Sequence, residues 1–185
     1  MATAIFTRLP RRRTVLKWMH WTMLPLFIWF LFMTPEVVLR LGGNTLFTIH
    51  SNVALFFVTL CLVWTAMHMR KGLASRPGPK LPGWARRFHR WVHITIIWGL
   101  FGVALTGFLL GLTSAVLLKA GGFLPIAPPM GWKHANEIVG KIHILEYYIL
   151  AAIVAAHAIF HMWRHIHLKD NALRIMVPKL LHRFL

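Results

Sequence analysis

Four long stretches of the sequence are almost free of charged side chains. Trp18–Pro35, Leu46–Met69 and Trp91–Leu118 contain no Asp, Glu, Lys or Arg, and Ile142–Trp163 contains a single acid, Glu146. About 20 consecutive apolar residues allow a helix to cross the roughly 30 Å hydrocarbon core of a bilayer. The pattern therefore predicts four membrane-spanning helices, at about residues 18–39, 46–69, 91–118 and 142–163. We expect one all-α domain over residues 1–185, an integral membrane four-helix bundle, because four spans leave no room for a second domain.

The charged residues are strongly biased toward Lys and Arg, with 21 of these against four acids and a formal net charge of +17. Such a charge is typical of nucleic-acid binding, but a chain that is 57% hydrophobic does not fit a soluble basic domain. We therefore expect membrane lipid, and no nucleic acid, as a partner. All but four of the basic residues precede the first span, follow the last, or lie between the second and third spans. The bias of Lys and Arg toward the cytoplasmic side predicts that both termini are cytoplasmic.

The connections between spans are predicted to be short, with one exception. Residues 113–141 contain paired glycines and three prolines, so this connection is expected to be irregular near the outer surface. Ser75–Pro82, also with three prolines, is interpreted as a tight cytoplasmic connector. Lys169 is expected to begin a short basic amphipathic tail along the inner surface.

Twelve histidines in such an apolar chain need a physical cause. An ionisable residue inside a span is costly and indicates function. Because successive spans alternate in direction, one group of histidines falls in the cytoplasmic half and another in the outer half. The cytoplasmic group contains His20, His93, His157 and His161, and the outer group contains His50 and His143.

The spacing of His143 and His157 is the most informative feature of the histidine pattern. Fourteen residues of helix return to nearly the same face, about 21 Å further along the axis. The last span can therefore present one imidazole at each of two depths, with His50 available to complete the outer pair and His20 the inner pair. Paired imidazoles without nearby thiolates or carboxylates suit the iron of b-type haem in a bundle core. A lone cysteine, Cys61, excludes an internal disulfide, an iron–sulfur cluster and a c-type attachment motif.

Several assignments remain open at this point. His161, one turn beyond His157, is a rival for the inner ligand, and His93 is a candidate third-helix ligand, propionate partner or quinone-pocket residue. Glu146 is either a proton or hydrogen-bond acceptor beside His143 or a neutral, hydrogen-bonded acid. The other histidines are expected to be interfacial or solvated; these are His68, His89, His134, His165, His167 and His182.

Several motifs together resemble the prokaryotic cytochrome b561 family over essentially the whole chain. They are Trp18-Met19-His20-Trp21, Ile49-His50, His93 with Thr106-Gly107, and His143, His157 and His165 followed by KDNALRIMVP at residues 169–178. The resemblance implies a four-helix bundle with two b haems near opposite membrane faces. It also implies that His157 with His20 binds the inner haem iron and His143 with His50 the outer one.

The resemblance implies electron transfer between a donor at one surface and quinone in the membrane. Our leading hypothesis is a di-haem cytochrome b of a bacterial inner membrane, with its donor at the outer face. In one role it would act as a superoxide:quinone oxidoreductase, and outer basic residues such as Lys119, Lys133 and Lys141 would attract the anion. In the other role it would be the membrane subunit of a dehydrogenase or hydrogenase complex, with a redox partner protein. A transition-metal transporter is the alternative from a different class, but a single acid within the spans argues against it.

Overall fold

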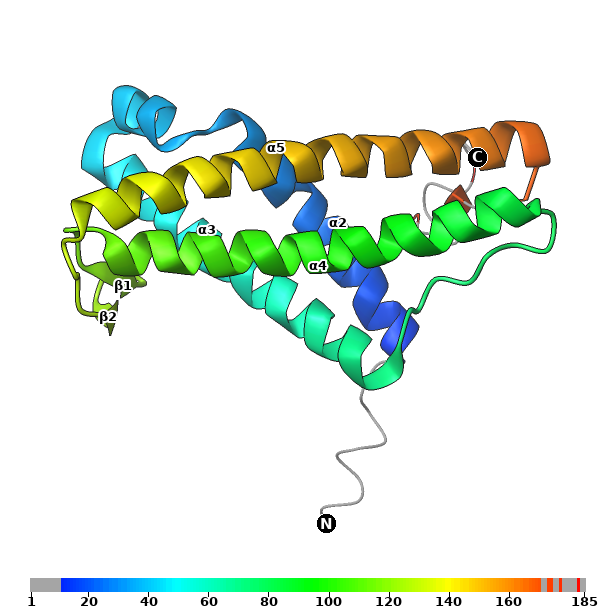
Figure 1. Cartoon of the computed structure of the whole chain (residues 1–185), viewed down its shortest axis with the longest axis horizontal. Helices are drawn as coiled ribbons and strands as arrows, with labels where there is room; N and C mark the ends of the chain where they lie inside the picture. Colours follow the sequence, from blue (N-terminus) through cyan, green and yellow to red (C-terminus); the bar gives the residue numbers. More distant parts are fainter. Residues whose placement is uncertain (1–10, 171–172, 175–176, 178–182, 184–185) are drawn as a thin grey trace, which may run out of the picture.

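Four long helices make up most of the chain in the computed structural model, which describes residues 11–170, 173–174, 177 and 183. The helices are α2 (Arg12–Phe32), α3 (Pro35–Lys71), α4 (Gly83–Thr113) and α5 (Lys133–Trp163), and a π-helical turn, η1 (Arg164–Leu168), continues α5. Each of the four is long and apolar enough to cross a membrane, which confirms the four-helix membrane bundle. Figure 1 shows α4 and α5 running side by side, with α2 and α3 crossing them obliquely.

The two ends of the bundle are distinguished by what connects the helices. A two-stranded antiparallel hairpin, β1 (Leu118–Ala120) and β2 (Leu124–Ala127), joins α4 to α5 and defines the hairpin end. The side-chain oxygen of Asn52 in α3 accepts a hydrogen bond from the backbone N–H of Gly121 (2.7 Å), which places the early part of α3 at this end. Residues 72–82 join α3 to α4 and define the connector end. Arg12, at the start of α2, donates to the carbonyl of Gly72 (2.6 Å), so successive helices alternate in direction.

Helix boundaries differ from the sequence prediction at several points, and α4 covers Gly83–Thr113 where residues 91–118 were predicted. The first span was expected to reach residue 39, but α2 ends at Phe32 and Pro35 starts α3, because Thr34 caps the new helix and proline is favoured in a first turn. The helix α3 is kinked at Gly42 and Gly43, where the φ of Gly43 is +54°. Residues 133–141, expected to be irregular, form the first turns of α5. The predicted amphipathic tail falls largely on residues outside the described part of the chain.

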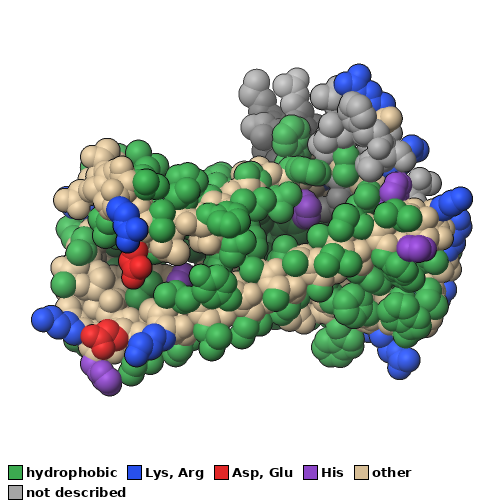
Figure 2. Space-filling view, turned by 90° about the horizontal axis from the view of Figure 1, so that it is seen from above, with side chains coloured by type: hydrophobic (Ala, Val, Ile, Leu, Met, Phe, Trp, Pro, Cys, Tyr) green, Lys and Arg blue, Asp and Glu red, His purple; other side chains and the backbone are tan. Residues whose placement is uncertain are grey.

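A compact apolar layer crosses the middle of the bundle. The ring of Phe27 in α2 stacks on Tyr147 in α5 (4.9 Å between centroids), and the Tyr147 hydroxyl donates to the Phe27 carbonyl (2.5 Å). Phe57 and Cys61 of α3 complete this layer, and Cys61 is fully buried. Figure 2 shows hydrophobic side chains along the length of the molecule and Lys and Arg at both ends, the distribution expected of a bundle surrounded by lipid.

A buried ion pair closes the connector end. Arg164 donates two hydrogen bonds to Asp170 (2.7 and 2.9 Å), and the two side chains are only 2% and 3% exposed. The connector packs directly onto this pair, because a Cβ at Gly78 would lie 2.9 Å from the Arg164 guanidinium. Lys80 of the connector also donates to the carbonyl of Leu168 (3.3 Å). The Arg164–Asp170 pair therefore joins the end of α5 to the segment that leads into α4.

Candidate functional site

The histidines singled out by the sequence gather in two layers of the bundle. The connector-end layer contains His20 of α2, His93 of α4, and His157 and His161 of α5, and the hairpin-end layer contains His50 of α3 and His143 of α5. Because α5 is a continuous helix through both histidines, their spacing corresponds to about 21 Å along its axis. The central apolar layer, with Tyr147, lies between them.

Imidazole rings crowd together in the connector-end layer. The His93 ring lies 4.7 Å from that of His157, and His157 lies 4.5 Å from His161, centroid to centroid. His20 of α2 lies near the rings of His93 and His157. Nδ1 of His20 and Nδ1 of His157 are buried without a hydrogen-bond partner among the described residues. Buried polar atoms without partners are uncommon, and these need an explanation.

A hydrogen-bonded chain fixes His143 in the hairpin-end layer. The Thr106 hydroxyl of α4 donates to Oε2 of Glu146 (2.8 Å) and lies 2.9 Å from Nδ1 of His143. A hydroxyl has one proton, so with that proton directed to Glu146 its oxygen accepts from the Nδ1–H of His143. Nε2 of His143 is then left unprotonated, the state that a metal-binding imidazole requires, and a polar group on the other ring nitrogen is the usual arrangement around such a ligand.

His50 of α3 lies at the same end of the bundle as His143. Its ring packs edge-on against Phe30 of α2 (5.1 Å), and its Nδ1 is buried without a partner among the described residues. On the α4 side, Gly107 makes room for His143: a Cβ at position 107 would lie 3.1 Å from Cε1 of that ring. This close approach requires a residue without a side chain.

A family model for prokaryotic cytochrome b561 matches residues 11–179. The chain belongs to the prokaryotic cytochrome b561 family. A comparison with curated proteins gave no match. The family match covers all four helices, and membership indicates a multi-pass membrane cytochrome b that binds haem b and takes part in electron transfer.

The residues of this cytochrome fit haem b. Haem iron takes axial imidazole ligands, and both histidine layers offer buried imidazole nitrogens that the described residues leave without partners. At the hairpin end the contact with Thr106 occupies Nδ1 of His143 and leaves Nε2 for iron, and Gly107 keeps the ring free of an adjacent side chain. No cysteine thiolate competes with the imidazoles for iron in either histidine layer, because the single cysteine lies in the central apolar layer.

A valine at position 107 tests the fit at the hairpin end. The added side chain would start 3.1 Å from the His143 ring and force that imidazole out of place. We expect Gly107→Val to bind less haem than the wild type, measured as haem per chain after purification. Gly83→Val is the matched control, because a Cβ at Gly83 meets no atom within 4 Å. Equal haem content in the two variants would contradict this placement.

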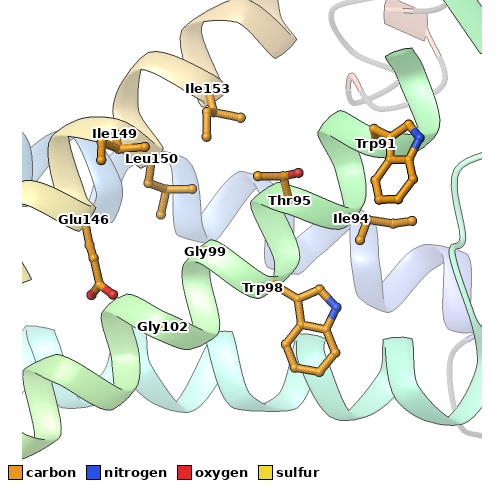
Figure 3. Close-up of a pocket in the computed structure, with 10 residues that line it drawn as sticks. All are labelled: Trp91, Ile94, Thr95, Trp98, Gly99, Gly102, Glu146, Ile149, Leu150 and Ile153. Carbon is orange, nitrogen blue, oxygen red and sulfur yellow. The ribbon is translucent and has the colours of Figure 1, made fainter. Parts of the chain in front are cut away.

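A groove of about 380 Å³ runs between α4 and α5 on the lateral surface of the cytochrome. Figure 3 shows Glu146 and Leu150 directed from α5 toward α4, where Gly99 and Gly102 present no side chains. Trp98 forms part of the α4 wall and is 46% exposed on the face that lipid would cover. Glu146 is the one acid among the lining residues, and it links the groove through Thr106 to His143.

Among the described histidines, one is placed differently from expectation; His182, also expected to be interfacial or solvated, lies outside the described residues. His89 was expected to be interfacial or solvated, but its side chain is fully buried. The connector covers it, and the hydroxyl of Ser75 lies 3.0 Å from its Nε2. The sequence around His89 is basic and polar, which suggested exposure; only the fold of the connector over α4 reveals the burial.

Proposed function

We propose that this cytochrome carries two b haems, one held by His20 and His157 and one by His50 and His143, and passes electrons between a donor at the hairpin-end face and membrane quinone. The observation that supports the proposal is the pair of histidine layers: His20 and His157 at one depth and His50 at the other each have a buried ring nitrogen without a partner among the described residues. Haem b supplies one-electron exchange at its iron when bound. The predicted topology makes the hairpin end the outer face of a bacterial inner membrane and the connector end the cytoplasmic face.

The protein's own residues set the position and chemistry of these ligands. Thr106 and Glu146 fix the orientation and tautomer of His143, and Phe30 packs against the ring of His50. The stacked Phe27 and Tyr147 rings hold α2 and α5 together between the layers. Rigid support of this kind keeps ligand geometry constant, which is what rapid electron exchange requires of a binding site.

The groove between α4 and α5 supports quinone as the membrane partner. Its volume falls in the range of about 300–1,000 Å³ typical of small-molecule sites, and it opens to lipid, from which a quinone would enter. Quinone reduction and quinol oxidation both require proton exchange, and Glu146 is the ionisable group that the groove offers. We assign Glu146 the role of hydrogen-bonding a quinone oxygen and holding the proton at its carboxylate.

Glu146→Gln separates proton exchange from haem binding. The amide keeps the size of the side chain and its contact with Thr106 but cannot exchange a proton. We expect quinone-dependent turnover to fall by about 100-fold or more, since positioned acid–base groups contribute about 10²–10⁴-fold. Haem per chain, from the same sample, should stay as in the wild type. Glu137→Gln, at an exposed position of α5, is the control and should retain full turnover.

Two outcomes would contradict the role of Glu146. Unchanged turnover in Glu146→Gln would show that its carboxylate does not exchange the proton. Loss of haem in proportion to the loss of turnover would show that Glu146 acts only by positioning His143.

The side chains at the hairpin end support two alternative physiological roles. Lys119, Lys133 and Lys141 are exposed there, and local positive potential raises the encounter rate of an anion such as superoxide. Quinone-dependent consumption of superoxide by the isolated protein tests this role. Phe123 and Leu124 of the hairpin are 80% and 58% exposed, a feature that favours the alternative, a membrane subunit docked to a dehydrogenase or hydrogenase. Copurification of a redox partner, together with no superoxide turnover, would favour the subunit role.

A further inference from the structure

Three histidines at the connector end converge on one point. His89 and His93 lie one turn apart on α4, and His161 faces them from α5. Their potential ligand nitrogens all lie within 4.8 Å of one another. The ring centroids of His89 and His161 are 5.8 Å apart, and those of His93 and His161 are 5.5 Å apart. None of the three is among the four haem ligands proposed above.

Two of the three rings, His89 and His93, are hydrogen-bonded through one nitrogen and keep the other available. Nδ1 of His93 lies 2.6 Å from the carbonyl of His89, and because a carbonyl only accepts, this Nδ1 carries the proton and Nε2 is free of it. Nε2 of His89 pairs with the Ser75 hydroxyl (3.0 Å), while its Nδ1 is buried without a partner among the described residues. Nε2 of His161 is likewise buried without a partner in the described part of the chain. Each ring thus has one nitrogen that these hydrogen bonds do not occupy.

We propose that His89, His93 and His161 form a binding site for a transition-metal ion of the Zn²⁺ type, separate from the haem sites. Three neutral imidazoles with one open position are a known ligand set for zinc, and the cluster consists of imidazoles alone. Zinc–nitrogen bonds of about 2.0–2.1 Å place tetrahedral ligand atoms about 3.4 Å apart, so binding would draw the three rings together by small rotations. The bound ion would then link the connector-end turns of α4 and α5.

The surroundings suit a cation site of this kind. The Arg164 guanidinium beside this cluster is paired with the Asp170 carboxylate (2.7 Å between Nη2 and Oδ2), which offsets part of its positive charge. His157 packs against both His93 and His161, and His20 approaches from α2. The cluster lies in the first turns of α4, next to the basic connector segment at the end of the bundle.

Metal content of the purified, haem-loaded protein tests the site. The wild type, incubated with Zn²⁺ and freed of unbound metal, should retain about one zinc per chain beyond its haem iron, measured by elemental mass spectrometry. His89→Ala should lose that zinc while keeping its haem, and His134→Ala, at an exposed position of the hairpin end, should retain both. Ser75→Ala should weaken zinc binding by about 10–100-fold, since groups that orient a ligand typically contribute that much.

Absence of bound zinc in the wild type, or equal zinc in His89→Ala and the wild type, would overturn the proposal. So would a loss of haem from His89→Ala that matches its loss of zinc, because the cluster would then belong to a haem site. If the variant does not fold, zinc-edge X-ray absorption on the wild type decides the question. Three imidazole nitrogens at about 2.0–2.1 Å support the site, and a shell without imidazole overturns it.

Discussion

Replacing His157 with alanine is expected to reduce the haem content from about two to about one per chain. The substitution removes the imidazole that the connector-end layer offers from α5, and His143 remains in place about 21 Å away on the same helix. The remaining haem should therefore keep its spectrum and its reduction potential. Haem per chain, with a redox titration of the α band, provides the measurement.

Three further variants make this result specific. His143→Ala should also retain about one haem. This should be the other haem, with the reduction potential that is lost in His157→Ala. His167→Ala, which removes an exposed histidine just beyond α5, should retain both haems. His161→Ala should also retain both; if it loses one and His157→Ala does not, His161 is the ligand at the connector end and our assignment of His157 is wrong.

Neutralising Asp170 should produce the largest loss of stability. In Asp170→Asn the Arg164 guanidinium, 2% exposed, keeps its charge but loses the carboxylate to which it donates two hydrogen bonds. Breaking one partner of a buried pair costs about 3–5 kcal/mol, because the other charge is left uncompensated. We expect a clearly lower midpoint of thermal unfolding in detergent, followed by far-ultraviolet circular dichroism.

Two comparisons distinguish this effect from a general effect of charge. Glu137→Gln neutralises an exposed acid and should unfold like the wild type. Replacing both partners with apolar residues, Arg164→Met with Asp170→Leu, should restore most of the lost stability, as is often observed for buried pairs. Wild-type unfolding in Asp170→Asn would show that the pair contributes little to the connector end.

Much of the architecture could be predicted from the sequence because a membrane span has a strong signature. A run such as Trp91–Leu118 has few other stable environments, and the four helices follow directly. The relation between His143 and His157 was also predictable, since spacing along one helix fixes both face and depth. The apolar runs could not locate the helix ends: Thr34 and Pro35 start a new helix inside the predicted first span.

Tertiary contacts explain the parts of the site that the sequence did not reveal. His89 looked interfacial because basic residues surround it, and its burial depends on a connector that folds back over α4. Asp170 looked like the start of a polar tail, but the π-helical turn after α5 carries Arg164 to it. Thr106 stood out only within a family motif; its pairing with His143 and Glu146 depends on how α4 packs against α5.

The haem content of the purified wild-type protein tests the central claim most directly. A pyridine haemochrome assay, combined with a quantitative measurement of protein, gives the type of haem and the number per chain. The two histidine layers predict protohaem at about two per chain, extractable into acid acetone because the chain has no thioether attachment motif. A folded protein that contains no haem, or one that holds a single haem unaffected by both His143→Ala and His157→Ala, would contradict the account.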